Sequence, residues 1–239
     1  MIYLPEMVDK IKDTIEGLKG NWQDYEAHKG EFETFKSNSY FYRETLYFTS
    51  SGDFKKADFP WLRAIRVKCQ GAGGAGGSIQ NGTGVSGAGS GGGYAESFIA
   101  DIESLPDTVQ VTVGAGGTTV TGGDGNPGGD SSFGSIVEAT GGGGGGSNGS
   151  TSTPGAGTGD FNIDGGWGAP GGSGTDFPSG VGGSSYMGSG GAGRRHGSNG
   201  FGGVGRGYGG GGGACRQGTS GTATGGNGAD GIVIVELYS

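Results

Sequence analysis

The chain has 239 residues, of which 65 are glycine, and a formal net charge of −8. Only 31% of the residues are hydrophobic, so a conventional apolar core must be small. Collagen is excluded, because it needs glycine at every third position and abundant proline, whereas this chain has seven prolines and irregularly spaced glycines. All but four glycines follow residue 70, and this part holds 12 acidic but only 4 basic residues. A nucleic-acid partner is therefore not expected.

Residues 1–38 carry apolar side chains at alternating spacings of four and three, the pattern of a coiled-coil heptad. Isoleucine occupies both seam positions, at Ile11 and Ile15, which favours three strands over two. A trimeric coiled coil for oligomerisation or docking is predicted. The alternative is a single amphipathic helix lying on the body, because three glycines weaken the helix. The predicted seam comprises Leu4, Val8, Ile11, Ile15, Leu18, Trp22, Tyr25 and Phe32, with Lys29 in the same series.

Residues 39–239 are predicted to form one mainly β domain. Short segments rich in β-branched and aromatic residues alternate with glycine-rich insertions, which is typical of an antiparallel sandwich with insertions leaving one end. The expected strands include two short ones within 44–59, followed by Leu62–Gln70, Tyr94–Ile102, Asp107–Gly114, Ser131–Thr140 and Gly231–Tyr238.

Within the insertions, glycine often recurs at every third position, as in Gly71, Gly74 and Gly77. A polyproline-II helix has three residues per turn, so such a register gives the helix a face without side chains. Bare faces allow helices to approach closely and to hydrogen-bond backbone to backbone. We expect ordered polyglycine-II helices. A flexible linker is the alternative, and the run Gly141–Gly146 is its best support.

The sequence shows no catalytic or metal-binding constellation, so neither an enzyme nor a cofactor is expected. The two histidines, His28 and His196, have no cysteine or carboxylate at a metal-ligand spacing. Cys69 and Cys215 do not form a disulfide framework, although a single bridge between them is an alternative. No apolar run approaches the roughly 20 residues of a membrane span, and the first ten residues lack the pattern of a signal peptide. The arginines and aromatics within 193–212 suggest an RNA-binding tract, which the acidic balance disfavours.

The glycine-rich part carries an ordered series of motifs, FTSSGDF, WLRAIRVKCQGAGGAGG, GGGYAESFI, VTVGAGG, GGDSSFGSIVEATGGGGG and GADGIVIVEL. This series resembles the glycine-rich domain of bacteriophage tail fibres and tail tips, over about residues 45–239. The resemblance implies a polyglycine-helix sandwich similar to the adhesin of T-even-like long tail fibres, which presents loops to a bacterial surface receptor. It also implies a location in the virion after synthesis in the host cytoplasm. The glycine-rich ectodomain of the anaplastic lymphoma kinase family is a more distant likeness.

The insertion at about 141–230 is the predicted receptor-facing region, because it is too long for a simple connection. Aromatic and arginine side chains anchor recognition surfaces, and they are scarce here. Trp167 and Tyr186 are expected in loops joining glycine helices, and the run Arg194–His196 could bind phosphates or acidic sugars. Alternatively, some of these aromatics plug the ends of the helix stack. The candidates are Phe161, Trp167, Phe177, Tyr186, Met187, Arg194, Arg195, His196, Phe201 and Tyr208.

The functional hypothesis at this level is a phage adhesin. Its expected partners are an outer-membrane protein or polysaccharide of the host, two further copies of the chain, and other tail proteins bound through the N-terminus. The alternative is a structural fibre or baseplate component that binds only other virion proteins. No nucleic-acid binding and no membrane insertion are expected.

Overall fold

The structure is a computed structural model that describes residues 4–172, 179–194, 200–218 and 221–239. The chain divides into two compact units, Met1–Phe41 and Tyr42–Ser239. In the described parts of the chain, no helix has the length and apolar character needed to cross a membrane.

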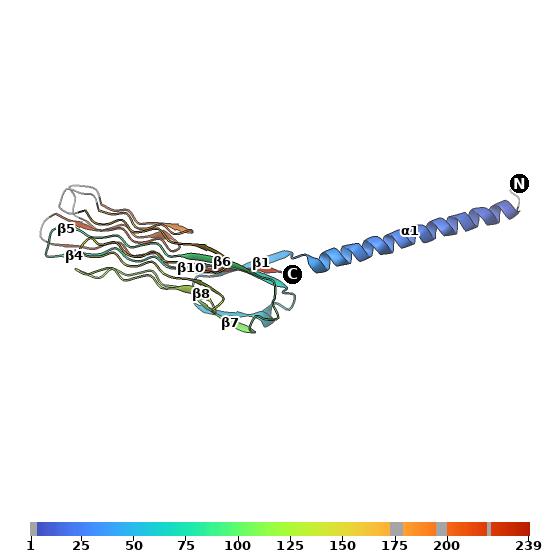
Figure 1. Cartoon of the computed structure of the whole chain (residues 1–239), viewed down its shortest axis with the longest axis horizontal. Helices are drawn as coiled ribbons and strands as arrows, with labels where there is room; N and C mark the ends of the chain where they lie inside the picture. Colours follow the sequence, from blue (N-terminus) through green and yellow to red (C-terminus); the bar gives the residue numbers. More distant parts are fainter. Residues whose placement is uncertain (1–3, 173–178, 195–199, 219–220) are drawn as a thin grey trace. The chain divides into compact units, whose positions relative to one another are not determined.

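The first unit is dominated by one long helix, α1 (Leu4–Asn38), as the heptad spacing predicts. Its polar face carries ion pairs three residues apart, for example Lys12 with Asp9 and Lys36 with Glu33. The seam side chains from Val8 to Phe32 are 44–64% exposed on this single helix. The helix therefore presents an apolar stripe to solvent. Figure 1 shows α1 as one uninterrupted helix.

The second unit contains a sandwich of two five-stranded antiparallel sheets, with strands drawn from both ends and the middle of the unit. The core between the two sheets is formed by side chains that alternate along the strands with outward-facing ones. It includes Ile65, Val67 and Cys69 from one sheet and Phe54 and Val111 from the other. The mainly β fold with a sandwich is thus confirmed. The first sheet has the order β1 (Tyr42–Phe48), β16 (Ile232–Tyr238), β3 (Ala64–Gln70), β6 (Tyr94–Ile99) and β11 (Phe161–Ile163). The second has β10 (Gly157–Thr158), β9 (Val137–Ala139), β8 (Ser131–Phe133), β7 (Thr108–Thr112) and β2 (Gly52–Lys55), which is followed by the 3-10 turn η1 (Lys56–Asp58).

Two details differ from the sequence prediction. The expected strand Ser131–Thr140 is a hairpin, β8 and β9, whose turn contains Gly134 at φ 56°. Strands β10 and β11 lie inside the predicted insertion, yet they pair with β9 and β6 of the sandwich. Within the 90-residue insertion, the chain therefore runs several times between the sandwich and the glycine-rich body.

The glycine-rich body is ordered through main-chain hydrogen bonds that repeat every third residue. Along segment 71–78, three consecutive N–H groups donate to three different segments, namely 86–93, 123–130 and 224–231, and the same order then repeats. We call the residues that face the same neighbouring segment one register. This three-residue cycle is that of a polyproline-II helix. The predicted glycine helices are confirmed, including the register Gly71, Gly74 and Gly77, whose N–H groups donate to Gly93, Ser90 and Gly87 at 2.9–3.0 Å.

Three segments, 71–78, 86–93 and 209–217, lie in the interior of this glycine lattice. Each is hydrogen-bonded to six neighbouring segments and is buried along its whole length. The other segments surround these three. The interior of the lattice is thus made of main chain, and its amides bond to one another without water.

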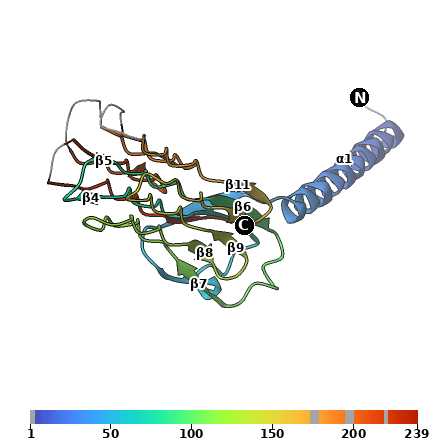
Figure 2. The same cartoon turned by 60° about the vertical axis from the view of Figure 1, so that its left-hand side comes forward.

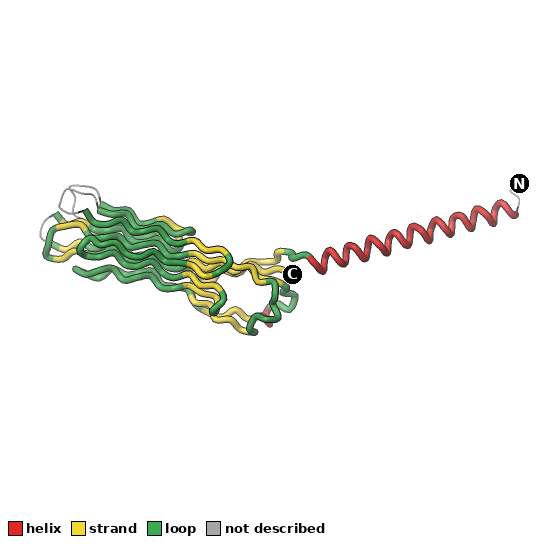
Figure 3. The backbone as a smooth tube through the Cα atoms, viewed as in Figure 1, coloured by secondary structure: helices red, strands yellow, loops and turns green. Residues whose placement is uncertain are grey.

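The segments run alternately away from the sandwich and back toward it. Figures 1 and 2 show them side by side, with β4 (Ile79–Gln80) and β5 (Gly84–Val85) at the end away from β6, β8 and β9. They are drawn as loops in Figure 3, because a polyglycine-II helix has neither α-helical nor β-ladder bonding. The remaining two-residue strands are β12 (Gly188–Ser189), β13 (Arg206–Gly207), β14 (Arg216–Gln217) and β15 (Thr222–Ala223).

Candidate functional site

The end of the lattice farthest from the sandwich is the strongest candidate site, and we call it the loop end. It contains the connections 79–85, 119–123 and 147–150, which join outward segments to returning ones. Two small ladders brace it: β4 pairs with β15, and β5 pairs with β14. The loop end is therefore a set of turns held by a hydrogen-bonded scaffold.

The connection 79–85 has a turn that its sequence requires. Asn81 has φ 54°, a left-handed conformation that asparagine tolerates, and Gly82 follows it. The Asn81 N–H donates to the Gly221 carbonyl at 2.8 Å. This connection precedes the predicted receptor-facing insertion, so the sequence analysis missed it, although the Asn-Gly pair between short apolar stretches is a turn signal.

A hollow of about 220 Å³ opens at the loop end, between the 79–85 and 147–150 connections. Among the described residues, no charged side chain lines it, and its polar side chains carry hydroxyl and amide groups. Such groups both donate and accept hydrogen bonds, as the hydroxyl groups of a sugar require. The lining residues are Ile79, Thr83, Gly84, Val85, Ser147, Asn148 and Gly172.

One wall of the hollow is fixed by Asp124. The N–H and the hydroxyl of Ser147 both donate to Asp124 Oδ1, at 2.7 and 2.8 Å. These two hydrogen bonds lower the pKa of the Asp124 carboxyl, because they favour its ionised form. Asn148 is held similarly, since its Oδ1 accepts the Ser150 N–H at 3.0 Å. The hollow is thus pre-formed by local contacts.

Two of the sequence-predicted candidates lie near this end. The Arg194 Nε donates to the Phe201 carbonyl, and the Phe201 ring is exposed. Gly200, next to Phe201, bridges to Arg216 of β14, one of the strands that brace the loop end. Three further candidates, Phe177, Arg195 and His196, lie outside the described residues.

Four other candidates lie at the opposite end, where the lattice meets the sandwich. The Tyr186 ring lies 4.4 Å from that of Tyr94 on β6, and the Phe161 ring lies 6.4 Å from it. The Met187 N–H donates to Gln70 of β3, and Tyr208 lies in the turn after β13. Tyr186 is in a turn, as predicted. This cluster covers the junction of sandwich and lattice, so the alternative of aromatics plugging the stack describes it better.

Trp167 does not lie in a loop, contrary to the prediction. It belongs to segment 164–172, where Gly166 and Ala169 donate to Ser184 and Val181 of the neighbouring segment. Its side chain points out from the flank of the lattice and is 65% exposed. A shallow groove of about 410 Å³ also lies on the flank, lined in part by Val181 and Val204.

Neither cysteine offers reactive chemistry. Both Cys69 and Cys215 are buried free thiols, so the disulfide alternative is wrong. Burial raises the pKa of Cys69 to about 12 and raises that of Cys215, which keeps both protonated at neutral pH. No group of three metal-ligating side chains occurs in the described ranges.

A comparison with curated proteins finds no match to the chain. A family model described as a glycine-rich domain matches residues 49–238, which covers the sandwich apart from β1 and the whole lattice. The chain therefore belongs to the glycine-rich domain family.

Proposed function

We propose that this protein is a receptor-binding protein of a bacteriophage tail fibre or tail tip, and that it attaches the virion to the surface of its bacterial host through the loop end. The observation that carries the proposal is the gathering of outward–return connections at one end of a lattice held by main-chain bonds. The resemblance of the glycine-rich motifs to tail-fibre sequences supplies the biological context.

This architecture suits recognition for a physical reason. Binding residues are commonly placed on loops that a rigid scaffold positions. In the lattice, the scaffold is stabilised by backbone hydrogen bonds, so the side chains of the connections contribute little to the interior. They remain available for contact with a ligand.

The chemistry of the loop end favours a hydroxyl-rich or mixed polar surface. The hollow offers Thr83, Ser147 and Asn148, while Arg194 and Phe201 add a cation and an aromatic ring nearby. A hollow of about 220 Å³ is smaller than a typical small-molecule site, which begins at about 300 Å³. Each contact is therefore weak, and firm attachment requires several loop ends to bind together.

A structural role in the fibre or baseplate is the second candidate. The exposed apolar stripe of α1 favours it, because such a stripe fits a protein partner. That role needs α1 but not the loop end, and this difference separates the two functions.

Binding to bacteria tests the proposal. Purified, fluorescently labelled protein is incubated with a panel of bacterial strains, and then with mutants of a bound strain that lack single outer-membrane proteins or surface polysaccharides. A double variant, Thr83→Arg with Asn148→Arg, fills the hollow and is expected to lower affinity at least tenfold. Thr153→Arg, an exposed change on the lattice flank, is the matched control and leaves binding intact.

The outcomes separate the hypotheses. Loss of binding in one class of surface mutant identifies the receptor as protein or polysaccharide. Binding that survives the filled hollow contradicts recognition at the loop end. Absence of binding to every strain, with co-purification of other virion proteins instead, supports the structural role.

A further inference from the structure

The apolar stripe of α1 requires a partner. Its side chains are strongly exposed on a single helix, for example Leu18 at 62% and Trp22 at 64%. Isolated helices draw little stability from propensity alone, and most helices are stabilised by packing of an apolar face. Gly17, Gly20 and Gly30 weaken this one further. Packing of the stripe against another surface would supply the missing stabilisation.

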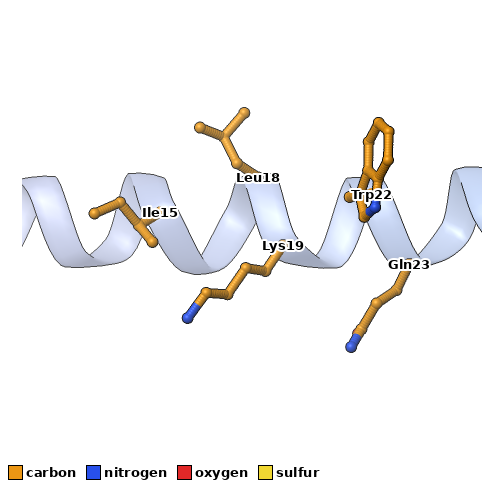
Figure 4. A pocket seen from close by; sticks show the side chains of 5 residues that line it. All are labelled: Ile15, Leu18, Lys19, Trp22 and Gln23. Atoms are coloured by element: carbon orange, nitrogen blue, oxygen red, sulfur yellow. The ribbon is translucent and has the colours of Figure 1, made fainter.

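The stripe contains a socket with the geometry of a coiled-coil hole. A hollow of about 380 Å³ is lined by Ile15, Leu18, Lys19 and Trp22, with Gln23 at its margin. Figure 4 shows Leu18 and Trp22 on one side of the helix and Lys19 and Gln23 on the other. The four principal residues are spaced three, one and three apart, so they form a diamond on the helix surface. A hole of four residues is what receives one side chain of a facing helix in knobs-into-holes packing.

We propose that the stripe of α1 docks two further copies of this chain, parallel and in register, and that Leu18 of each copy enters the socket of the next. In this register, identical residues meet at each level. Every seam layer from Val8 to Tyr25 is then wholly apolar. Isoleucine at both Ile11 and Ile15 sets the number of strands at three.

Lys29 fixes the register. It is the first polar residue of the seam, and its ammonium group lies 3.8 Å from Glu26 on the same helix. In the in-register trimer, Lys29 lies at the edge of the apolar layers, where its ammonium group keeps Glu26 as a partner and stays near water. Any shift of one helix by a heptad would set Lys29 against Trp22 and bury its charge, which is strongly unfavourable.

An antiparallel pair is the main competitor, because its charges also match. One antiparallel alignment places Lys12 against Glu33 and Lys19 against Glu26 of the other helix. The same alignment brings Lys29 to the level of Leu18 and so breaks the apolar series. Exposed ion pairs contribute less than burial of large apolar side chains, so the parallel arrangement is favoured.

The assembly state of the full chain tests the proposal. Light scattering or sedimentation equilibrium at micromolar concentration is expected to give about three times the chain mass of 23.5 kDa. Leu18→Glu places a charge in the socket and is expected to yield monomers. The matched control Ala27→Glu, an exposed change on the opposite face of α1, keeps the trimer. A monomeric wild-type protein overturns the proposal, and so does a Leu18→Glu variant with unchanged mass.

Orientation is tested separately with Val8→Cys. Because Cys69 and Cys215 are buried, the exposed thiol introduced at position 8 is the one that reacts under mild oxidation. A parallel assembly brings the new thiols of different copies together, and a disulfide-linked band of twice the chain mass is expected on a denaturing gel. In an antiparallel pair the two thiols lie about 45 Å apart, at about 1.5 Å of helix per residue, and cannot form a disulfide. Absence of the cross-linked band from the oxidised Val8→Cys protein would therefore refute the parallel arrangement. Bacterial binding by monomeric Leu18→Glu protein, weakened but retained, would leave the adhesin proposal standing on its own.

Discussion

Glycine in the lattice interior is required because its neighbours are backbone atoms. A methyl group added at Gly74 would lie within 3.0 Å of the Gly143 carbonyl oxygen, which has no room to move. Ala72 and Ala75 occupy the one register of segment 71–78 in which a methyl group is accommodated, and both are fully buried. Segment 71–78 thus accepts small side chains in one register and glycine in the other two.

We predict that Gly74→Ala destabilises the second unit by roughly 1–3 kcal/mol or more, because the overpacked methyl group forces two segments apart. Urea unfolding followed by tryptophan fluorescence measures the loss. Gly52→Ala is the matched control, because a methyl group there meets nothing within 4 Å, and it is expected to change stability by less than about 0.5 kcal/mol. Equal stability of the two variants would contradict the close approach of the segments.

Polar side chains complete the lattice where a segment has no neighbour to accept its N–H. Asp130 Oδ1 accepts the Gly141 N–H at 2.8 Å, and Asp230 Oδ1 accepts the Gly116 N–H at 2.7 Å. Several acidic residues of the glycine-rich part therefore have a structural role. Composition showed their excess, but only the contacts explain it.

At the scale of the elements, the outer face of the first sheet carries a network of charges and rings. Glu236 on β16 accepts hydrogen bonds from Lys68 on β3 and from the Tyr238 hydroxyl. Burial opposes the ionisation of Glu236, but these hydrogen bonds and the nearby charges of Lys68 and Arg66 outweigh it and lower its pKa. The network therefore joins β3 to β16 as long as Glu236 is ionised.

A pH dependence follows from this lowered pKa. Glu236 contributes stability at pH values above the ordinary carboxyl value of 4.5, and this contribution is lost as the pH falls through its folded-state pKa. Glu236→Gln is expected to cost roughly 1.5–3 kcal/mol at pH 7, the usual contribution of a hydrogen bond to a charged group. Urea unfolding at pH 3 to 7 measures the difference between wild type and variant.

The difference should shrink as the pH falls below 4.5, because the unfolded chain then takes up a proton at Glu236 that the folded protein does not. It should vanish once the pH is below the lowered folded-state pKa, where Glu236 is protonated in the folded protein as well. Glu44→Gln, on the exposed face of β1, is the control and is expected to follow the wild type. A Glu236→Gln variant with the same deficit at every pH would contradict the role of the ionised carboxylate.

Strands with strong alternation were predictable, and short ones were not. The alternation in Leu62–Gln70 and the β-branched residues of 108–113 and 232–237 correctly indicated β3, β7 and β16. Strands β10 and β11 have only two and three residues, so no period can be recognised in them. Their positions are set by pairing with β9 and β6, which are distant in sequence.

At the scale of the whole second unit, the candidate site was predictable only in kind. The scarcity of large side chains singled out Arg194 and Phe201, which lie near the loop end, but also Phe161 and Tyr186, which lie at the opposite end. The sequence shows that the chain returns to the sandwich, but it does not show how many times the chain runs along the lattice before it does so. Only the hydrogen-bonded pairing of segments decides which turn falls at which end.

The central claim is that the glycine-rich body is an ordered lattice rather than a linker, and amide hydrogen exchange tests it most directly. Peptides covering segments 71–78, 86–93 and 209–217 are followed by mass spectrometry in the native protein. We predict that their hydrogen-bonded amides exchange as slowly as those of β3 and β16, because the three segments are surrounded on all sides by other segments. Exchange of these three segments at the rate of an unfolded chain would contradict the lattice and the proposals built on it.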